Sequence, residues 1–349
     1  MGVARVVVPL LALCLCGGAA GGRPQPSGTL VVESRLINDW SGHALFVLKP
    51  TGGRPRTLIG RASVGQPGAD YDLPAWSPDM TRVAYGRCVH ETQCRIGIVN
   101  LRTRKPKPLS RGTGPSWAPD GRTLAFAASR PEEIDEALSW SWLATVPVEG
   151  GRARRLARGL IVDAPAWSPD GRHIAFVGIP ASGDPATARA WLYTIRPNGR
   201  SLRRLVEVAA GGQLSGDIGH FRPSWSPDSK CLAVGGAQSL IVVNLDGRMR
   251  WRLDNRQLVL SPSWSPEGRR IAFNDHPNIY VVNRDGTGVR ALTRGKIETS
   301  LHGWERGGRS LAITRELGGL FLVDAQGRGE RKLLDGDFGD VVWGWPRRR

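Results

Sequence analysis

The sequence has little of what catalytic and metal sites are usually made from. Among 349 residues there are only six histidines and five cysteines. It lacks the Gly-x-Ser-x-Gly nucleophile motif, the His-Glu-x-x-His zinc motif and the Gly-Lys-Ser/Thr phosphate loop. His90-Glu91 does not begin a zinc motif, because position 94 is Cys. We therefore predict no catalytic residues, no metal and no cofactor, although distant loops could still assemble a site.

Long hydrophobic runs are also missing, except near residue 1. There, Arg5 precedes an apolar stretch from Val6 to Cys16, and Gly18-Ala19-Ala20 follows it. A positive start, an apolar middle and small residues at the end are typical of a signal peptide. The stretch is too short for a membrane span, which needs about 20 residues. We expect residues 1–20 to be a signal peptide and the protein to be exported, periplasmic or extracellular.

A lipid anchor at Cys14 or Cys16 is the alternative to full secretion. It fits less well, because Leu13 and Leu15 stand where a small residue is expected before such a cysteine. No other segment is apolar and long enough to span a membrane. Residues 21–28 are expected to form a short linker.

What the sequence does have is a repeated tryptophan motif. Its copies are Pro74-Ala-Trp-Ser-Pro-Asp79, Pro115-Ser-Trp-Ala-Pro-Asp-Gly121, Pro165-Ala-Trp-Ser-Pro-Asp-Gly171, Pro223-Ser-Trp-Ser-Pro-Asp228, Pro262-Ser-Trp-Ser-Pro-Glu-Gly268 and the degenerate His302-Gly-Trp-Glu-Arg-Gly-Gly308. After each copy comes an apolar triad such as Leu124-Ala-Phe126, then a second apolar run, a turn such as Asp246-Gly247, and a short run ending in Leu. The 45 Gly and 25 Pro of the chain supply these turns. Four short strands in a unit of about 40 residues predict the blade of a β-propeller.

The two ends of the repeat region predict how the ring closes. Residues 29–59 contain three strand-like runs with no inner strand before them, and residues 340–346 look like a lone inner strand. Joining them gives seven blades, with six as the alternative, in an all-β domain over residues 29–346, followed by a basic tail, 347–349. Such closure removes the free sheet edges, which would otherwise promote aggregation. Either Trp343 or Trp345 could take the place of the repeat tryptophan.

These repeats resemble those of the TolB-type propeller family, whose hallmark is a Trp-Ser-Pro-Asp-Gly turn followed by Leu/Ile-Ala-Phe. The resemblance covers residues 29–346 and implies the fold more than a function, since similar repeats occur in TolB, in tricorn-like proteases and in prolyl-oligopeptidase-type enzymes. The chain departs from TolB by lacking its preceding α/β domain and by having seven blades instead of six. The role of TolB in envelope maintenance is therefore not carried over. The WD-repeat pattern matches less well, because no Trp-Asp dipeptide closes the units.

Strand alternation assigns the connections to two faces of the ring. With the strands of a blade lettered A to D from the centre outward, the A–B and C–D turns share one face, which we call the hairpin face. The B–C and D–A connections share the other, which carries the insertions expected at 127–139, 177–189 and 206–222, and which we call the insertion-rich face. Long loops raised from a rigid scaffold commonly bind ligands. The predicted ligand-binding residues at the channel mouth there are Tyr71, Asp72, Asp163, His220, Arg222 and His302, and a water-lined channel without a ligand is the alternative.

The net charge of +17 favours acidic partners. Much of it falls in C–D turns and D strands, as at Arg102, Arg104, Lys105, Lys107, Arg152, Arg154, Arg155, Arg200, Arg203, Arg204, Arg248, Arg250, Arg252, Arg328, Arg331 and Lys332. This distribution predicts a basic outer wall, which serves solubility or a weak attraction to anionic surfaces. Nucleic acid is not expected as a partner of an exported chain.

Two functions remain open. The first is a non-catalytic extracytoplasmic propeller that binds an envelope protein, a peptide or a glycan on the insertion-rich face. The second is a secreted propeller hydrolase or lyase with its site at the channel mouth. A tight cluster of His with Asp or Glu would favour the enzyme, and a broad groove would favour binding.

The cysteines that remain after export give a testable prediction. Cys88 and Cys94 flank a short loop between two strand-like runs, so an oxidising compartment should join them and leave Cys231 free. Thiol counting on the denatured mature protein should find one free thiol, and three after reduction. Three free thiols without reductant would contradict the disulfide.

Overall fold

The structure is a computed structural model that describes residues 28–35, 44–60, 69–89, 93–129, 141–182, 187–210, 221–257, 259–316 and 318–344. These ranges contain β-strands joined by turns and no α-helix. None of the described segments forms a helix of the length and apolarity that a membrane crossing requires. The signal peptide, the linker up to residue 27 and the basic tail lie outside the described residues and stay predictions.

Seven four-stranded antiparallel sheets form the blades. In each blade the first strand named is the innermost and the last is the outermost. Blade 1 is β28 (Asp337–Gly344), β1 (Thr29–Arg35), β2 (Ala44–Leu48) and β3 (Arg56–Ile59). Blade 2 is β4 (Ala69–Trp76), β5 (Arg82–Val89), β6 (Gln93–Asn100) and β7 (Pro106–Arg111). Blade 3 is β8 (Thr113–Trp117), β9 (Thr123–Ser129), β10 (Ser141–Pro147) and β11 (Arg154–Arg155).

The other four blades follow in chain order. Blade 4 is β12 (Leu160–Trp167), β13 (Ile174–Pro180), β14 (Arg189–Ile195) and β15 (Arg203–Ala210). Blade 5 is β16 (Ser224–Trp225), β17 (Cys231–Gly235), β18 (Leu240–Asn244) and β19 (Met249–Leu253). Blade 6 is β20 (Val259–Trp264), β21 (Arg270–Asp275), β22 (Asn278–Asn283) and β23 (Arg290–Ala291). Blade 7 is β24 (Thr299–Trp304), β25 (Ser310–Arg315), β26 (Gly319–Asp324) and β27 (Glu330–Leu334).

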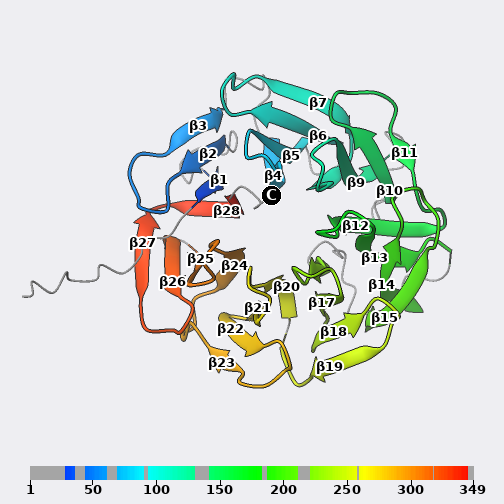
Figure 1. Cartoon of the computed structure of the whole chain (residues 1–349). Helices are drawn as coiled ribbons and strands as arrows, with labels where there is room; N and C mark the ends of the chain where they lie inside the picture. Colours follow the sequence, from blue (N-terminus) through cyan, green and yellow to red (C-terminus); the bar gives the residue numbers. More distant parts are fainter. Residues whose placement is uncertain are drawn as a thin grey trace, which may run out of the picture.

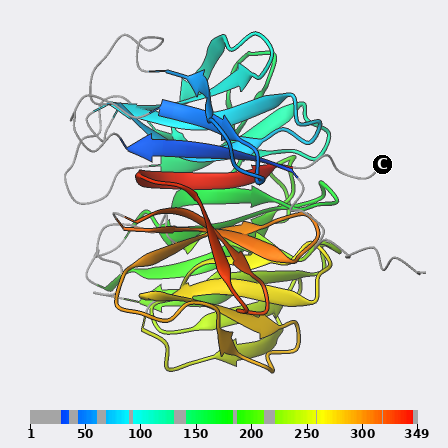
Figure 2. The same cartoon turned by 90° about the vertical axis from the view of Figure 1, so that its left-hand side faces the viewer.

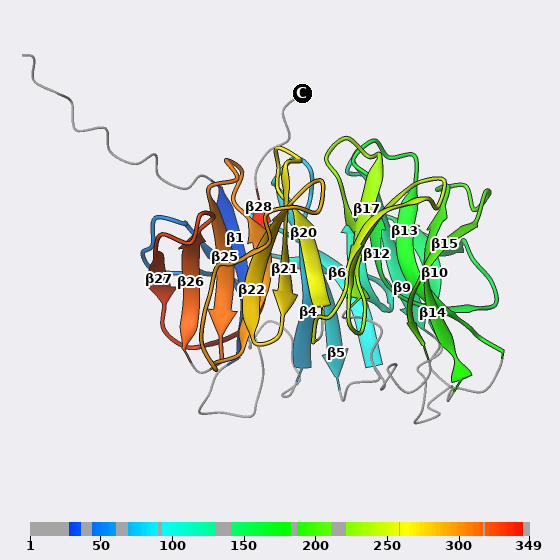
Figure 3. The same ribbon diagram turned by 90° about the horizontal axis from the view of Figure 1, so that it is seen from below.

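The blades stand around a central axis as a closed ring (Figure 1), so the prediction of a seven-bladed propeller is confirmed. Figure 3 shows the ring edge-on, with the strands running between its two faces. The red β28 lies beside the blue β1 and closes blade 1 (Figure 2). This closing strand begins at Asp337, three residues earlier than the sequence indicated, because pairing with β1 extends to the pair Arg35 and Asp337.

Strand register identifies the tryptophan that takes the repeat position in the closing blade. In the other blades the repeat tryptophan pairs with the first residue of the apolar triad, as Trp117 does with Leu124. In blade 1, Trp343 pairs with Leu30, which begins the triad Leu30-Val31-Val32. Trp343 therefore takes the repeat position. Trp345 lies outside the described residues.

The hydrophobic core is divided among the joints between blades. Each of the seven clusters of buried side chains draws its members from two neighbouring blades, and every joint has one. In blade 3, Leu124 and Phe126 face blade 2, whereas Ala125 faces blade 4. Successive side chains of a strand point to opposite faces, so the large-Ala-large triad presents two large residues to one joint and a small one to the next. Ala125 thereby leaves room for the large residues of blade 4.

Polar contacts of the repeat tryptophans reinforce the joints. At four joints the indole N–H donates to the carbonyl oxygen of the residue before the preceding blade's tryptophan, over 2.9 to 3.3 Å: Trp76 to Val342, Trp117 to Ala75, Trp225 to Ala166 and Trp304 to Ser263. At two others the main-chain N–H of the tryptophan donates to a serine hydroxyl instead: Trp167 to Ser116 and Trp264 to Ser224. The buried indole N–H groups of Trp167 and Trp264 have no hydrogen-bond partner in the structure. At six joints the repeat tryptophan therefore forms a hydrogen bond to the preceding blade, through either its indole N–H or its main-chain N–H.

The Ser-Pro-Asp turns are built from one repeated set of hydrogen bonds. The hydroxyl of Ser77 donates to the carboxylate of Asp79 at 2.6 Å and accepts the main-chain N–H of Arg82 at 2.9 Å. Ser168 and Ser226 make the same two contacts in their own turns. Because these serines are buried, the hydrogen bonds satisfy hydroxyls that would be costly to enclose unpaired.

The described cysteines lie in two places, the hairpin of blade 2 and the joint between blades 5 and 6. Cys88 and Cys94 are opposite each other on β5 and β6, and their sulfur atoms are bonded. Cys231 is a free thiol at the start of β17 and is fully buried.

Replacing two of the tryptophans by phenylalanine should separate packing from hydrogen bonding. Trp304→Phe removes an indole that donates to Ser263, whereas Trp264→Phe removes one whose N–H has no partner. Both side chains are buried, so the loss of packing is similar. We expect Trp304→Phe to lower the free energy of unfolding by about 1 kcal/mol more than Trp264→Phe. Denaturant unfolding of both variants measures the difference, and equal losses would contradict the role of the hydrogen bond.

Candidate functional site

The two faces of the ring carry connections of different length. On the hairpin face, short turns such as 77–81, 118–122 and 226–230 join the strands. The strands that flank the longest connections, 130–140 and 211–223, end at the opposite face, as do the strands that flank 36–43, 60–68 and 181–188. The sequence pointed to three of these, but placed their starts too early. Strand pairing continues to Ser129, Pro180 and Ala210, which shortens each insertion.

A recurring β-bulge shapes the inner strands where they approach the insertion-rich face. In five blades the pairing of strand A with strand B shifts register at one position. The last residues before these shifts are Asp72, Thr113, Asp163, Leu260 and Leu301. Ala164 and Ser261, which follow two of them, have left-handed backbones with φ of 42° and 45°. A bulge bends its strand and redirects side chains. These shifts therefore set where the polar residues of the mouth stand.

Asp163 and Arg222 stand at the inner ends of the adjacent blades 4 and 5. The carboxylate of Asp163 accepts the main-chain N–H of Ala164 at 2.6 Å, which holds the bulge in place. Just before it, the main-chain N–H of Val162 donates to the hydroxyl of Ser141 in blade 3 at 3.2 Å. Arg222 is partly buried and precedes β16 by two residues. An acid and a base at neighbouring positions can bind a ligand with groups of both charges.

His302 has a structural task at the joint between blades 7 and 1. Its Nε2 is 2.8 Å from the hydroxyl of Thr314, and its Nδ1 accepts the main-chain N–H of Val341 at 3.3 Å. Burial lowers the pKa of His302 to about 4, and the negative charge of Asp340 opposes this decrease. The ring is therefore neutral at physiological pH. A ligand could use it only by breaking one of these two contacts.

Sequence reasoning missed buried polar residues at this joint and at the joint between blades 6 and 7. Glu33 is only 2% exposed, and its carboxylate accepts the main-chain N–H of Asp340 at 3.1 Å. Glu33 directly follows the apolar triad on strand B. Asn274 and Thr314 hold the same position in blades 6 and 7. Asn274 donates to the carbonyl of Thr299 in the next blade at 2.7 Å. A polar residue directly after the triad is the signal that could have indicated them.

The remaining predicted mouth residues are described in part or not at all. Tyr71 and Asp72 belong to β4, where their backbones pair with Arg87 and Gly86, and their side chains are outside the description. His220 lies outside the described residues. The structure thus places Asp163, Arg222 and His302 on blades 4, 5 and 7. Within the described ranges, no three His, Cys, Asp or Glu side chains gather closely enough to hold a metal ion.

Many basic residues of the outer wall tie neighbouring blades together. Side chains at the starts of D strands donate to carbonyl oxygens in the C–D turn of the next blade: Lys107 to Val148 and Glu149, Arg154 to Asn198, Arg290 to Ala325, and Arg331 to Pro50 and Thr51. Charged donors form stronger hydrogen bonds than neutral ones. Part of the basic charge therefore serves the ring itself.

Similar proteins share this architecture. TolB from Acinetobacter baumannii superposes with a TM-score of 0.54 at 18% identity, over 91% of this chain and 67% of that one. The fold is that of the TolB-type propellers. An oligogalacturonate lyase in complex with manganese gives a TM-score of 0.60 at 14% identity, over 86% of this chain and 94% of the lyase. At such low identities the likeness is one of fold alone.

One curated protein is similar in sequence over a shorter stretch. The uncharacterized peptidase YuxL of Bacillus subtilis (strain 168) is 35% identical over 92 residues. The match covers 24% of this chain and only 13% of the peptidase, so the chain spans a small part of that protein's length. No protein-family model matches the chain.

The low pKa of His302 gives a prediction for stability against pH. The ordinary pKa of histidine is 6.5 and that of folded His302 is about 4, so between these values the unfolded chain binds a proton that the folded chain does not. The free energy of unfolding should fall by on the order of 3 kcal/mol as the pH drops from 7.5 to 4. Denaturant unfolding should show a smaller fall for His302→Gln, because the amide does not titrate. The exposed His276→Gln serves as control, and equal falls in both variants would contradict the assignment.

Proposed function

We propose that this chain is a non-catalytic, exported propeller that binds an envelope protein, a peptide or a glycan on its insertion-rich face. The observation that carries the proposal is that the strands flanking the longest connections, 130–140 and 211–223, end at the face where Asp163 and Arg222 stand. The rigid joints hold these inner ends in fixed positions, as a binding site on loops requires. The proposed export depends on the signal-like residues 1–20.

The described part of the mouth supports binding more than catalysis. His302 is the only mouth histidine among the described residues, and both of its ring nitrogens are engaged within the protein. A general base must reach the proton that it removes. Asp163 is held by its own bulge through the N–H of Ala164. These side chains are better suited to shaping a surface than to transferring protons.

A propeller hydrolase or lyase is the second candidate. Its support is the likeness of fold to the oligogalacturonate lyase and the short similarity to the peptidase YuxL. Assays on oligogalacturonate, with and without manganese, and on a panel of chromogenic peptides distinguish the two candidates. Turnover that disappears in a mouth variant would establish the enzyme and contradict the binding proposal.

A combined mouth variant tests the site itself. Asp163→Asn keeps an oxygen that can accept the N–H of Ala164, while His220→Gln and Arg222→Gln remove an imidazole and a positive charge from the mouth. We expect a partner captured from envelope extract by the wild-type protein to bind the triple variant at least about tenfold more weakly, because charged hydrogen bonds are lost. Affinity is then measured with the purified partner at physiological salt.

The control is a variant of the hairpin face that removes three positive charges, whereas the mouth variant leaves the net charge unchanged because Asp163→Asn and Arg222→Gln cancel. Arg102→Gln, Arg152→Gln and Arg248→Gln alter exposed residues of C–D turns, which lie on the face opposite to the mouth. Their removal should leave affinity within about twofold, since exposed charges are screened beyond about 8 Å at physiological ionic strength. If this variant alone loses the partner and salt abolishes wild-type binding, the protein is an electrostatic surface binder and the mouth is not its site.

A further inference from the structure

In blades 2, 4, 5 and 6, one position of the repeat lies beside the tryptophan of the next blade; in blades 3 and 7 the same position holds Thr123 and Ser310. It is the fifth residue after the repeat serine, at the start of strand B. In blade 2 this residue is Arg82, whose guanidinium lies 5.1 Å from the ring of Trp117 and donates to the carbonyl of Gly121 at 3.1 Å. In blade 6 it is Arg270, which lies 4.9 Å from Trp304 and donates to Gly308. Both arginines cross to the next blade and fill the space over its tryptophan.

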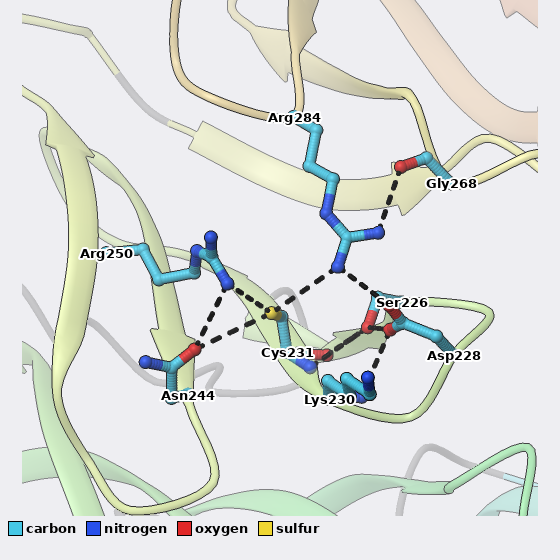
Figure 4. A network of polar contacts seen from close by, with 8 residues as sticks. All are labelled: Ser226, Asp228, Lys230, Cys231, Asn244, Arg250, Gly268 and Arg284. Carbon is cyan, nitrogen blue, oxygen red and sulfur yellow. Dashed lines mark hydrogen bonds and ion pairs between the residues drawn. The ribbon is translucent and has the colours of Figure 1, made fainter.

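Blade 5 fills the same space from the other side. Its residue at this position is Cys231, and Arg284 of blade 6 reaches back over Trp264 at 5.4 Å. Arg284 donates to the carboxylate of Asp228 at 2.7 Å and to the carbonyl of Gly268 at 3.4 Å (Figure 4). Its guanidinium also lies 4.0 Å from the sulfur of Cys231. In blade 5 the small residue at the start of strand B is therefore compensated by a large one from blade 6.

At the joint between blades 4 and 5, neither blade provides such an arginine. The residue of blade 4 at this position is His173, which stacks beside Trp225 of blade 5 with ring centroids 6.3 Å apart but has no guanidinium to donate to the next turn. The position that Arg284 occupies in blade 6 is Leu245 in blade 5, which cannot provide a guanidinium. A cleft of about 630 Å³ remains between the two turns of blade 4. It is lined by Arg172, His173, Arg196, Pro197 and Asn198.

The cleft carries positive charge that nothing in the described structure neutralises by contact. Neither guanidinium, that of Arg172 or that of Arg196, has a hydrogen bond or ion pair with another described residue, and both residues are exposed. They differ in this from Arg154, whose guanidinium is used for the carbonyl of Asn198 in the same turn. The nearby carboxylate of Asp170 accepts the hydroxyl of Ser168 at 2.6 Å. Two arginines from opposite turns are thus available to a ligand.

The imidazole on the floor of the cleft adds little charge. Burial is the largest cause of a lowered pKa at His173. The carboxylate of Asp170 opposes the decrease, and three guanidinium groups reinforce it, those of Arg196, Arg203 and Arg172. The Nδ1 atom of His173 is enclosed and has no hydrogen-bond partner in the structure. A neutral ring stacked on an indole offers a flat, weakly polar surface beneath the two cations.

We propose that this cleft binds an oxyanion group, a carboxylate or a phosphate, carried on a small organic molecule whose body packs on Pro197 and the His173 ring. Guanidinium groups pair with both kinds of oxyanion through parallel hydrogen bonds. The amide of Asn198 supplies a neutral donor or acceptor for the same ligand. The volume exceeds what a bare ion occupies, so it accommodates a ring the size of a sugar. The site lies on the hairpin face and does not depend on the function proposed for the opposite face.

Isothermal titration with four defined probes tests the cleft: glucuronate, glucose 6-phosphate, inorganic phosphate and neutral glucose. We expect saturable binding of glucuronate, glucose 6-phosphate or both, weaker binding of inorganic phosphate, and none of glucose. The sugar that binds more tightly identifies carboxylate or phosphate as the natural group. Arg172→Gln with Arg196→Gln should weaken that binding about tenfold or more. Absence of binding by both anionic sugars would overturn the proposal.

A matched control separates the cleft from general attraction to a basic protein. Arg122→Gln with Arg248→Gln removes the same charge, and Arg122 occupies in blade 3 the turn position that Arg172 occupies in blade 4. This control should bind the anionic sugar as the wild-type protein does. An equal loss of affinity in the control and in the cleft variant would overturn the proposal.

The decisive variant is His173→Arg, which restores the residue found in blades 2 and 6. Its guanidinium should cross over Trp225 as Arg82 crosses over Trp117, fill the cleft and abolish binding, although the protein gains a positive charge. Thermal unfolding at or above the wild-type temperature would show that the joint is intact. Binding of the anionic sugar that is unchanged or tighter in His173→Arg would show simple charge attraction and overturn the site.

Discussion

The structure depends on the contact between one tryptophan and the blade before it. Each repeat tryptophan fills a joint that neither blade could fill alone, because every cluster of buried side chains draws on two blades. A blade taken by itself would expose both of its apolar faces, so the ring gains its stability only when all joints are closed. Closure by β28 is part of the same requirement, since Trp343 supplies the joint of blade 1.

The fold was predictable because the same sequence pattern recurs in six blades and, split between the two ends of the repeat region, in the seventh. The spacing of the tryptophans, the large-Ala-large triads and the unmatched strands at the two ends all lead to one topology. Local details were less accessible. The bulge after Asp163 and the longer pairing up to Ser129 depend on hydrogen bonds between strands, which no single segment encodes. Little of the mouth could be derived for the same reason, as the engagement of His302 with Val341 joins segments 39 residues apart.

The candidate cleft of blade 4 lies where the repeat departs from the arginine of blades 2 and 6. Where an arginine holds this position, as in blades 2 and 6, its guanidinium lies over the tryptophan of the next blade. Where Arg82 and Arg270 are replaced by Cys231, a neighbouring arginine restores the packing. Where they are replaced by His173, nothing does, and a cleft results. Alignment of the repeats within this single chain is thus a way to find sites that no short motif reveals.

The same reasoning changes how the net charge of +17 is interpreted. A basic surface is usually taken as attraction to acidic partners, yet Arg154 and Arg331 donate to turn carbonyls of the next blade and hold the outer wall together. Such arginines are already satisfied and would lose hydrogen bonds by turning to a ligand. Arg172 and Arg196 have no such contact to lose. We therefore expect this protein to bind anions through arginines whose guanidinium groups form no hydrogen bond within the described ring. Because Arg172 and Arg196 lie on two turns of one blade, they favour a small ligand over an extended surface.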